Sequence, residues 1–131
     1  MTGGTAAPCP CLSGETYGEC CGRFHEGFAG GVWPATAVEL MRSRYSAFVA
    51  GRPDYLLATW HPSTRPATLV LDEDIRWRRL DVVRTAAGGP FDDRGTVEFA
   101  AHYLHDGERG VQREVSRFAR EDSRWYYVDG G

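Results

Sequence analysis

All four cysteines of this chain lie within thirteen residues, and this clustering constrains the fold more than any other feature of the sequence. The order is Cys-Pro-Cys, then eight residues, then Cys-Cys. A structural zinc ion takes four nitrogen or sulfur ligands in a tetrahedron, so each of two close turns must supply two of them. Ser13-Gly14 allows the chain to reverse between the pairs, and adjacent cysteines suit a bend or the start of a helix. The spacing therefore predicts a closed zinc knuckle over residues 9–21, with four ligands: Cys9, Cys11, Cys20 and Cys21.

Other uses of these cysteines stay open at this point. A disulfide here would close a very short loop, whereas stabilising disulfides usually close long ones. An iron–sulfur cluster usually has wider ligand spacing. His25, four residues after Cys21, is an alternative fourth ligand. Tyr17 is placed to shield the site, and Arg23 to offset the negative charge of four thiolates around one zinc ion.

Length and charge set wider limits. The chain has 131 residues and a net charge of −3, which suits one soluble domain plus a small appendage. We expect no signal peptide, because the start has neither a positive charge nor an apolar run, and no membrane span, which needs roughly 20 apolar residues. The expected location is the cytoplasm, where thiols stay reduced. Bulk charge gives no support to a nucleic-acid partner, but a specific acidic partner stays open because charge can be local.

The bias in basic and amide residues is best explained by codon usage. All 15 basic residues are arginine, lysine and asparagine are absent, and Ile75 is the only isoleucine. This pattern is typical of a GC-rich bacterial genome, and we infer no function from the arginine content.

The sequence changes character along its length. Residues 1–35 are rich in Gly, Pro and Cys and hold too few aliphatic side chains for a core. Residues 36–60 have helical spacing, with Thr36 as a capping residue, Gly51 as a stop and Pro53 opening a second helix. Residues 67–131 have the pattern of β-strands: an apolar run at 69–71, then strands near 77–85, 96–104, 111–120 and 125–128. Helices followed by antiparallel strands predict an α+β domain in which a curved sheet wraps onto helices.

Two parts of the chain resemble known bacterial sequences. Residues 9–22 are similar to the SEC-C motif, the zinc-binding tail of the SecA translocase and of other bacterial proteins. The motif usually has Gly in place of Leu12 and ends in Cys-His, as in the translocase, or in Cys-Cys, as here. Residues 40–48, 59–62, 114–118 and 125–130 look like the YchJ family. The resemblance implies a SEC-C-like knuckle over residues 1–30 and a cone-shaped nuclear transport factor 2-like (cystatin-like) domain over residues 31–131. It implies no particular reaction.

Cone-shaped domains of this type include both enzymes and binding or dimerisation modules, so the fold does not decide the function. An enzyme would need an acid or base at the floor of an apolar pocket. His61, at the end of the second predicted helix, is one candidate, although a positive charge at a helix C-terminus is the commoner use of such a residue. Glu114, beside Ser116 on one strand face, is the other, and here the catalytic and structural interpretations balance.

Other charged residues favour structural interpretations. Glu98 and His102 share the predicted outer face of a strand, where cross-strand charge pairing is the usual role. Arg42 and Arg44, inside the first helix, are candidates to pair with a buried carboxylate, and a structural ion pair is the commoner outcome.

Two functions therefore stand as hypotheses. The first is a binding or adaptor module whose knuckle docks a protein or a nucleic acid, while the cone binds a small ligand or forms a homodimer. The second is an enzyme of the isomerase, dehydratase or hydrolase kind that uses the cone pocket with His61 or Glu114. Because a four-cysteine site leaves no open coordination position, the zinc is expected to be structural in either case. Metal binding would also supply folding energy to a segment without a core of its own.

Overall fold

A computed structural model describes residues 6–130 of the chain. The helical segments come first: η1 (Tyr17–Glu19), α1 (Cys21–Gly27), η2 (Phe28–Gly30), α2 (Ala37–Ala50) and α3 (Pro53–Ala58). The strands follow: β1 (Ile75–Ala87), β2 (Arg94–His105), β3 (Glu108–Glu121) and β4 (Arg124–Gly130). These strands form one antiparallel sheet in the order β1-β2-β3-β4. The predicted α+β architecture is confirmed.

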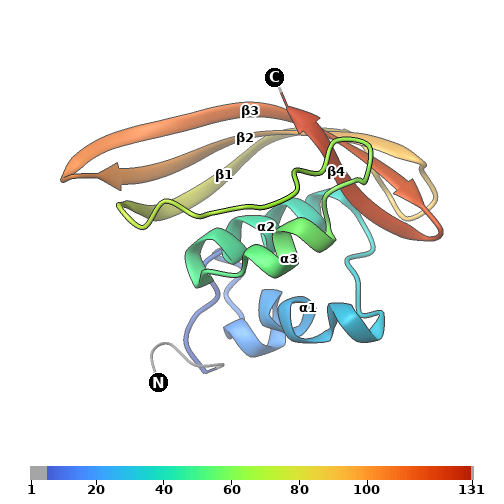
Figure 1. Cartoon of the computed structure of the whole chain (residues 1–131), viewed down its shortest axis with the longest axis horizontal. Helices are drawn as coiled ribbons and strands as arrows, with labels where there is room; N and C mark the ends of the chain where they lie inside the picture. The colour runs from blue at the N-terminus through green and yellow to red at the C-terminus, as the bar shows by residue number, and fades with distance from the viewer. Residues whose placement is uncertain (1–5, 131) are drawn as a thin grey trace.

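The elements form three layers. The curved sheet covers one side of α2 and α3, and α1 with the cysteine-bearing segment lies on the other side of these helices (Figure 1). The sheet uses one face, here called the inner face, to contact α2, and no helix of the described residues packs on the opposite, outer face. No helix among the described residues is long and apolar enough to cross a membrane.

The ends of α2 are set by the residues that the sequence identified. The Thr36 hydroxyl accepts a hydrogen bond from the Glu39 backbone N–H at 3.2 Å, and Gly51 ends the helix in the left-handed conformation with φ of 72°. Only glycine adopts that conformation readily, so it is a common helix stop. Pro53 then occupies the first turn of α3, where its missing N–H is not needed.

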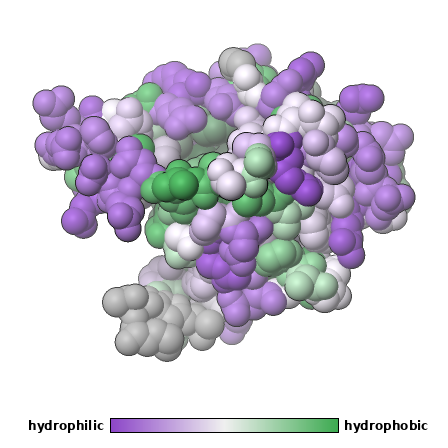
Figure 2. Space-filling view, viewed as in Figure 1, coloured by the Kyte–Doolittle hydropathy of each residue, from purple (hydrophilic) through white to green (hydrophobic). Residues whose placement is uncertain are grey.

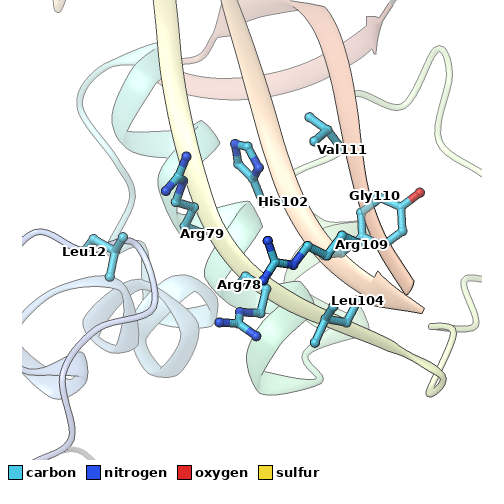
Figure 3. Close-up of a pocket in the computed structure, with 9 residues that line it drawn as sticks. Leu12, Arg78, Arg79, His102, Leu104, Arg109, Gly110 and Val111 are labelled. Atoms are coloured by element: carbon cyan, nitrogen blue, oxygen red, sulfur yellow. The ribbon is translucent and has the colours of Figure 1, made fainter. Parts of the chain in front are cut away.

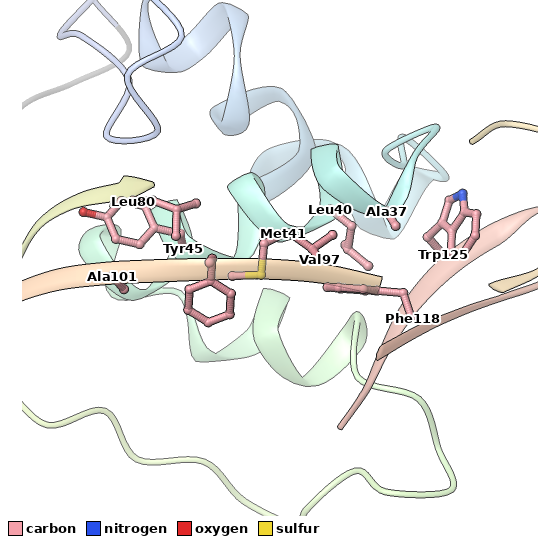
Figure 4. Packing of buried hydrophobic residues seen from close by; sticks show 10 residues of the cluster. Ala37, Leu40, Met41, Tyr45, Leu80, Val97, Ala101, Phe118 and Trp125 are labelled. Carbon is pink, nitrogen blue, oxygen red and sulfur yellow. The ribbon is translucent and has the colours of Figure 1, made fainter. Parts of the chain in front are cut away.

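The core lies between α2 and the inner face of the sheet. Ala37, Leu40, Met41 and Tyr45 project from the helix towards Leu80, Val97, Ala101, Phe118 and Trp125 of the strands (Figure 4). Trp125 is fully buried, and its indole N–H donates to the Ala35 carbonyl at 3.1 Å. Alternation along β2 places Val97, Phe99 and Ala101 inside, as the sequence predicted. Glu98 and His102 face outwards, where they meet Arg84 and Asp81 respectively.

The predicted β region, residues 67–131, begins too early. The apolar run 69–71 forms no strand, and regular pairing begins only at Ile75. Leu69 and Leu71 instead pack against a second hydrophobic cluster centred on Tyr55 and Leu56, while Val70 is 90% exposed. Figure 2 shows apolar surface on the side where this segment crosses in front of the helices. Side-chain packing therefore takes the place of strand pairing in this segment.

A close approach of backbones joins α2 to the β1–β2 turn. Gly88, with φ of 82°, accepts a hydrogen bond from the Ala37 N–H at 3.0 Å, and a Cβ atom on Gly88 would lie 2.8 Å from the Cβ of Ala37. We expect Gly88→Ala to lower the free energy of unfolding by about 1–3 kcal/mol in denaturant titrations. Gly107→Ala is the control, because Gly107 has φ of 81° but no atom within 4 Å of its added Cβ. Equal losses in both variants would contradict a role for the Ala37 contact.

Candidate metal centre

The first pair of cysteines lies in a tight reversal of the chain. Pro8 and Thr16 form an isolated antiparallel bridge, and the Cys9 N–H donates to the Glu15 carbonyl at 3.0 Å. Between these points the Leu12 N–H donates to the Cys9 carbonyl, and Leu12 adopts a left-handed φ of 64°. This backbone state explains why glycine is usual at the position in SEC-C motifs, since glycine adopts it without a steric penalty.

The second pair lies at the start of α1. Cys20 is the N-cap residue and Cys21 is the first residue of the helix, so the bend predicted for adjacent cysteines is present. Tyr17 packs against the cysteine cluster, as expected. Gly22 is required beneath it, because a Cβ there would lie 2.6 Å from the Tyr17 carbonyl oxygen. Arg23 bonds the Cys20 carbonyl at 3.1 Å and stacks on Phe24.

The four sulfur atoms form a candidate metal site. All of them lie within 4.8 Å of one another, with Cys11 and Cys20 sulfurs 3.5 Å apart and Cys20 and Cys21 sulfurs 4.0 Å apart. A tetrahedral ion with metal–sulfur bonds of about 2.3 Å needs sulfurs about 3.8 Å apart, so the donor set fits such an ion. The separations are far beyond the roughly 2.05 Å of a disulfide, and all four thiols are free.

Without a cation, the thiols cannot all ionise together. Hydrogen bonds from Cys11 and Cys21 hold the pKa of Cys9 well below its usual range. Cys11 receives a stabilising hydrogen bond from Cys21, but its contact with Cys9 and its burial outweigh this and raise the pKa of Cys11 to about 11. Its contacts with Cys11 and Cys9, together with burial, raise the pKa of Cys21. A bound cation would offset this repulsion, and four thiolates are the form that a metal requires.

Two hydroxyl groups contact the sulfurs, and sequence reasoning did not identify either. Ser13 donates to the Cys20 sulfur at 3.1 Å. Ser46, on α2, lies 3.7 Å from the Cys9 sulfur. Ser13 lies within the cysteine motif, so its contact with a sulfur could have been expected from the sequence. Ser46 is 37 residues from Cys9, and no nearby sequence pattern indicates its contact. Its position shows that the cysteine cluster lies directly against α2.

His25 is not brought into the sulfur group. It is fully buried, and its two ring nitrogens contact the Tyr17 hydroxyl at 2.5 Å and the Ser43 carbonyl at 2.8 Å. A carbonyl only accepts, so Nε2 carries the proton and Nδ1 accepts from Tyr17. Burial lowers the pKa of His25, which favours this neutral ring. His25 thus connects the cysteine-bearing segment to α2.

The other sequence candidates lie in two different places. His61 follows α3 near the surface, where Nδ1 contacts Ser63 at 2.7 Å and Nε2 bonds the Glu121 carboxylate. Glu114 lies half-buried on β3, where it accepts hydrogen bonds from Ser116 at 2.5 Å and from Tyr127 at 3.2 Å. The structure therefore does not bring His61 and Glu114 together.

Arg44 lies beside the Glu114 network but bonds elsewhere. Its guanidinium donates to the Leu56 carbonyl at 2.8 Å and to the Thr59 hydroxyl at 2.7 Å. Its charged carbon is 4.6 Å from the ring centre of Tyr127. Within residues 6–130 it has no carboxylate within ion-pair distance. For Arg44, neutral acceptors and aromatic rings therefore replace the predicted ion pair.

The fold and the cysteine cluster define a SEC-C motif protein with a nuclear transport factor 2-like domain. The SEC-C model matches residues 7–23, and the model for the middle, nuclear transport factor 2-like domain of YchJ matches residues 36–130. The chain belongs to the YchJ family, whose members are also named UPF0225 proteins.

Relatives and solved structures agree with this assignment. The chain is 52% identical to a UPF0225 protein of Streptomyces coelicolor, over 94% of each chain, and 53% identical to one of Chromobacterium violaceum, over 95% of this chain and 92% of that relative. The solution structure of a SEC-C motif protein from Rhodopseudomonas palustris matches with a TM-score of 0.79 and 33% identity, over 94% of this chain and 96% of that one. A crystal structure from Psychrobacter arcticus matches with a TM-score of 0.77 and 27% identity, over 92% and 80%.

Proposed function

We propose that this protein is a cytoplasmic, zinc-dependent binding protein whose knuckle forms part of a docking surface. The observation that carries the proposal is the closed donor set, because four sulfurs around one point leave no coordination position for water or substrate. Zinc is the ion that such a set of four thiolates commonly holds in structural sites. Its role here is to fix the shape of the segment that bears Leu12.

Leu12 supports the docking role. It is a large aliphatic side chain, 64% exposed, at the tip of the knuckle turn. Its left-handed backbone costs about 1–3 kcal/mol relative to an unstrained residue. An exposed leucine in a strained turn contributes little to the stability of the fold. A contact with another molecule is therefore the simplest role for its side chain.

Measured metal content tests the proposal. We expect purified protein to contain about one zinc ion per chain by elemental analysis, and Cys11→Ser to contain much less. Reconstitution of chelated protein with zinc should restore the content of the wild type but not of the variant. Iron with the visible absorption of an iron–sulfur cluster, or a full complement of thiols without metal, would overturn the assignment.

An enzyme acting in the cone is the second candidate function, and the observation behind it is a cavity. An apolar cavity of about 300 Å³ lies between α2, the segment at 69–72 and the inner face of the sheet, with Gln112 and Asp72 at its polar side. His61 and Glu114 are not among the residues that line it. Much of the inner face is filled by the hydrophobic core (Figure 4). This arrangement supports ligand binding in the cavity better than acid–base catalysis.

A further inference from the structure

A second concave site lies at the β1 edge of the sheet, between the outer face and the knuckle. A groove of about 560 Å³ crosses β1, β2 and β3 and reaches the knuckle, where Leu12 lines it (Figure 3). Its lining includes His102, Leu104 and Val111. Register places these side chains on the outer face, since His102 pairs with both Arg79 and Val111. We call this site the outer groove.

Three arginines surround the outer groove. Arg78 and Arg79 come from β1, and Arg109 comes from β3 (Figure 3). Two adjacent residues of one strand reach the same groove because a β-bulge lies between Trp77 and Arg79. Arg79 is paired with Asp81 at 3.3 Å, but Arg78 and Arg109 have no carboxylate within 4 Å among the described residues. The groove therefore presents two uncompensated positive charges beside an aliphatic lining.

The charge extends beyond the groove. Within residues 76–84, 98–104 and 109–117, the acidic side chains on the outer face are Asp81 and Glu98. Asp129 of β4 lies in register with Arg117 on the same face and pairs with it. The arginines on that face within these three ranges are Arg76, Arg78, Arg79, Arg84, Arg109, Arg113 and Arg117. These are seven of the chain's 15 basic residues, although the chain as a whole has a net charge of −3. A local basic face is thus present in an acidic protein.

We propose that the outer groove binds an acidic segment of another protein, with carboxylates on the arginines and aliphatic side chains over Leu12, Leu104 and Val111. This rests on the docking function proposed above and assigns it a site and a partner chemistry. Arginine binds carboxylates in a fork of two hydrogen bonds, which gives such a site both charge and direction.

Other occupants fit less well. A second copy of this chain would bring arginine-rich outer faces together, and like charges in contact disfavour the pair. Single-stranded nucleic acid is usually bound by stacking bases on aromatic rings. The aromatic residue at the groove, Tyr103, lies in register with Trp77 on the inner face, and their ring centres are 5.5 Å apart. The aliphatic lining therefore favours a peptide over a polynucleotide.

Fluorescence anisotropy with the full zinc-loaded protein tests the proposal. The probe is a labelled peptide of alternating glutamate and leucine, compared with the same peptide carrying glutamine and with an oligothymidine of equal charge. We expect the acidic peptide to bind tightest, with an affinity that falls as salt rises. Tighter binding of oligothymidine, or equal binding of the glutamine peptide, would overturn the proposal.

Variants locate the binding. Arg78→Gln combined with Arg109→Gln should raise the dissociation constant at least about tenfold. Arg42→Gln combined with Arg94→Gln removes the same charge elsewhere and should change it less than about twofold. Leu12→Gly relieves backbone strain rather than adding it, so weaker binding by that variant, about threefold or more, reports the lost side chain and not misfolding. Equal effects of the two arginine pairs would contradict a defined groove.

Chelation separates this inference from the proposed function. If metal-free protein loses the peptide while the Arg78/Arg109 variant keeps it, the knuckle docks elsewhere and only the outer groove is rejected. If metal-free protein keeps the peptide while that variant loses it, the groove stands and zinc-dependent docking is rejected. If none of the proteins binds the acidic peptide, the outer groove is rejected as a site for acidic peptides, and the proposed zinc-dependent docking is not tested by this result but by metal content.

Discussion

Removing the metal is expected to lower the melting temperature of the whole chain by roughly 10 °C or more, in one transition. The cysteine-bearing segment is not a separate unit, because α1 packs against α2 and α3. Phe24 of α1 is 6% exposed and lies in a cluster with Ala47, Tyr55 and Leu56. Exposing one such phenylalanine costs about 1.5–3 kcal/mol.

Polar contacts across the same boundary add to this loss. The His25 ring bonds the Ser43 carbonyl, and Arg52 bonds the His25 carbonyl at 2.8 Å. Each buried hydrogen bond contributes about 1 kcal/mol. A total of about 3.5–5 kcal/mol corresponds to roughly 10–20 °C in a chain of this size.

Circular dichroism on zinc-loaded, chelated and reconstituted protein measures the effect. Added zinc should restore the original melting temperature, and Cys11→Ser should melt like the chelated wild type with or without zinc. An unchanged melting temperature after chelation, or two separate transitions, would mean that the knuckle folds independently of the sheet and its helices.

The second large effect is expected from Arg44→Ala, which should lower the free energy of unfolding by about 3–5 kcal/mol. Arg44 is 4% exposed and joins three elements of the structure. Its side chain bonds the end of α3 at Leu56 and Thr59, and its guanidinium lies over the rings of Trp60 and Tyr127 at 5.2 and 4.6 Å. The substitution removes these contacts together and leaves a cavity.

The lowered pKa of Arg44 reflects the cost of burying its positive charge. Burial lowers the pKa of Arg44 to about 10, yet the group stays protonated at neutral pH. Burial and the neighbouring Glu114 carboxylate raise the pKa of Tyr127 to about 12, so that ring stays a neutral donor to Glu114. The aromatic faces and neutral acceptors compensate the buried charge, and the nearby Glu114 carboxylate adds to this without forming an ion pair.

Urea unfolding of matched variants tests this role. Arg42→Ala, in the same helix, should stay within about 0.5 kcal/mol of the wild type. Arg44→Lys keeps the charge but lacks the planar fork, so most of the loss should persist. A loss below about 1 kcal/mol for Arg44→Ala would show that the aromatic cluster packs equally well without the cation.

Local features of the fold were predictable because neighbouring residues cause them. The helix start at Thr36 and the stop at Gly51 depend on side-chain and backbone chemistry within one turn. The turn at Asp106–Gly107 has two left-handed residues, with φ of 52° and 81°, which is what Asp-Gly favours between strands. The clustering of the four cysteines likewise follows from short spacing.

Features that depend on distant contacts were not predictable. Ser46 reaches the Cys9 sulfur only because α2 lies against the knuckle. The segment at 69–71 has strand-like composition, but the second hydrophobic cluster binds its leucines. The outer groove combines three strands with the knuckle, so no single stretch of sequence carries its pattern.

The bulge at Arg78 has a consequence for how this surface can change over evolutionary time. Trp77 and Leu80 both face the core although three positions separate them, and the intervening extra residue makes this possible. Loss of that single codon would restore regular alternation between these two core residues and remove one groove arginine. A deletion at this point would therefore change the side chains that line the outer groove by one residue, while the buried side of the strand keeps its register.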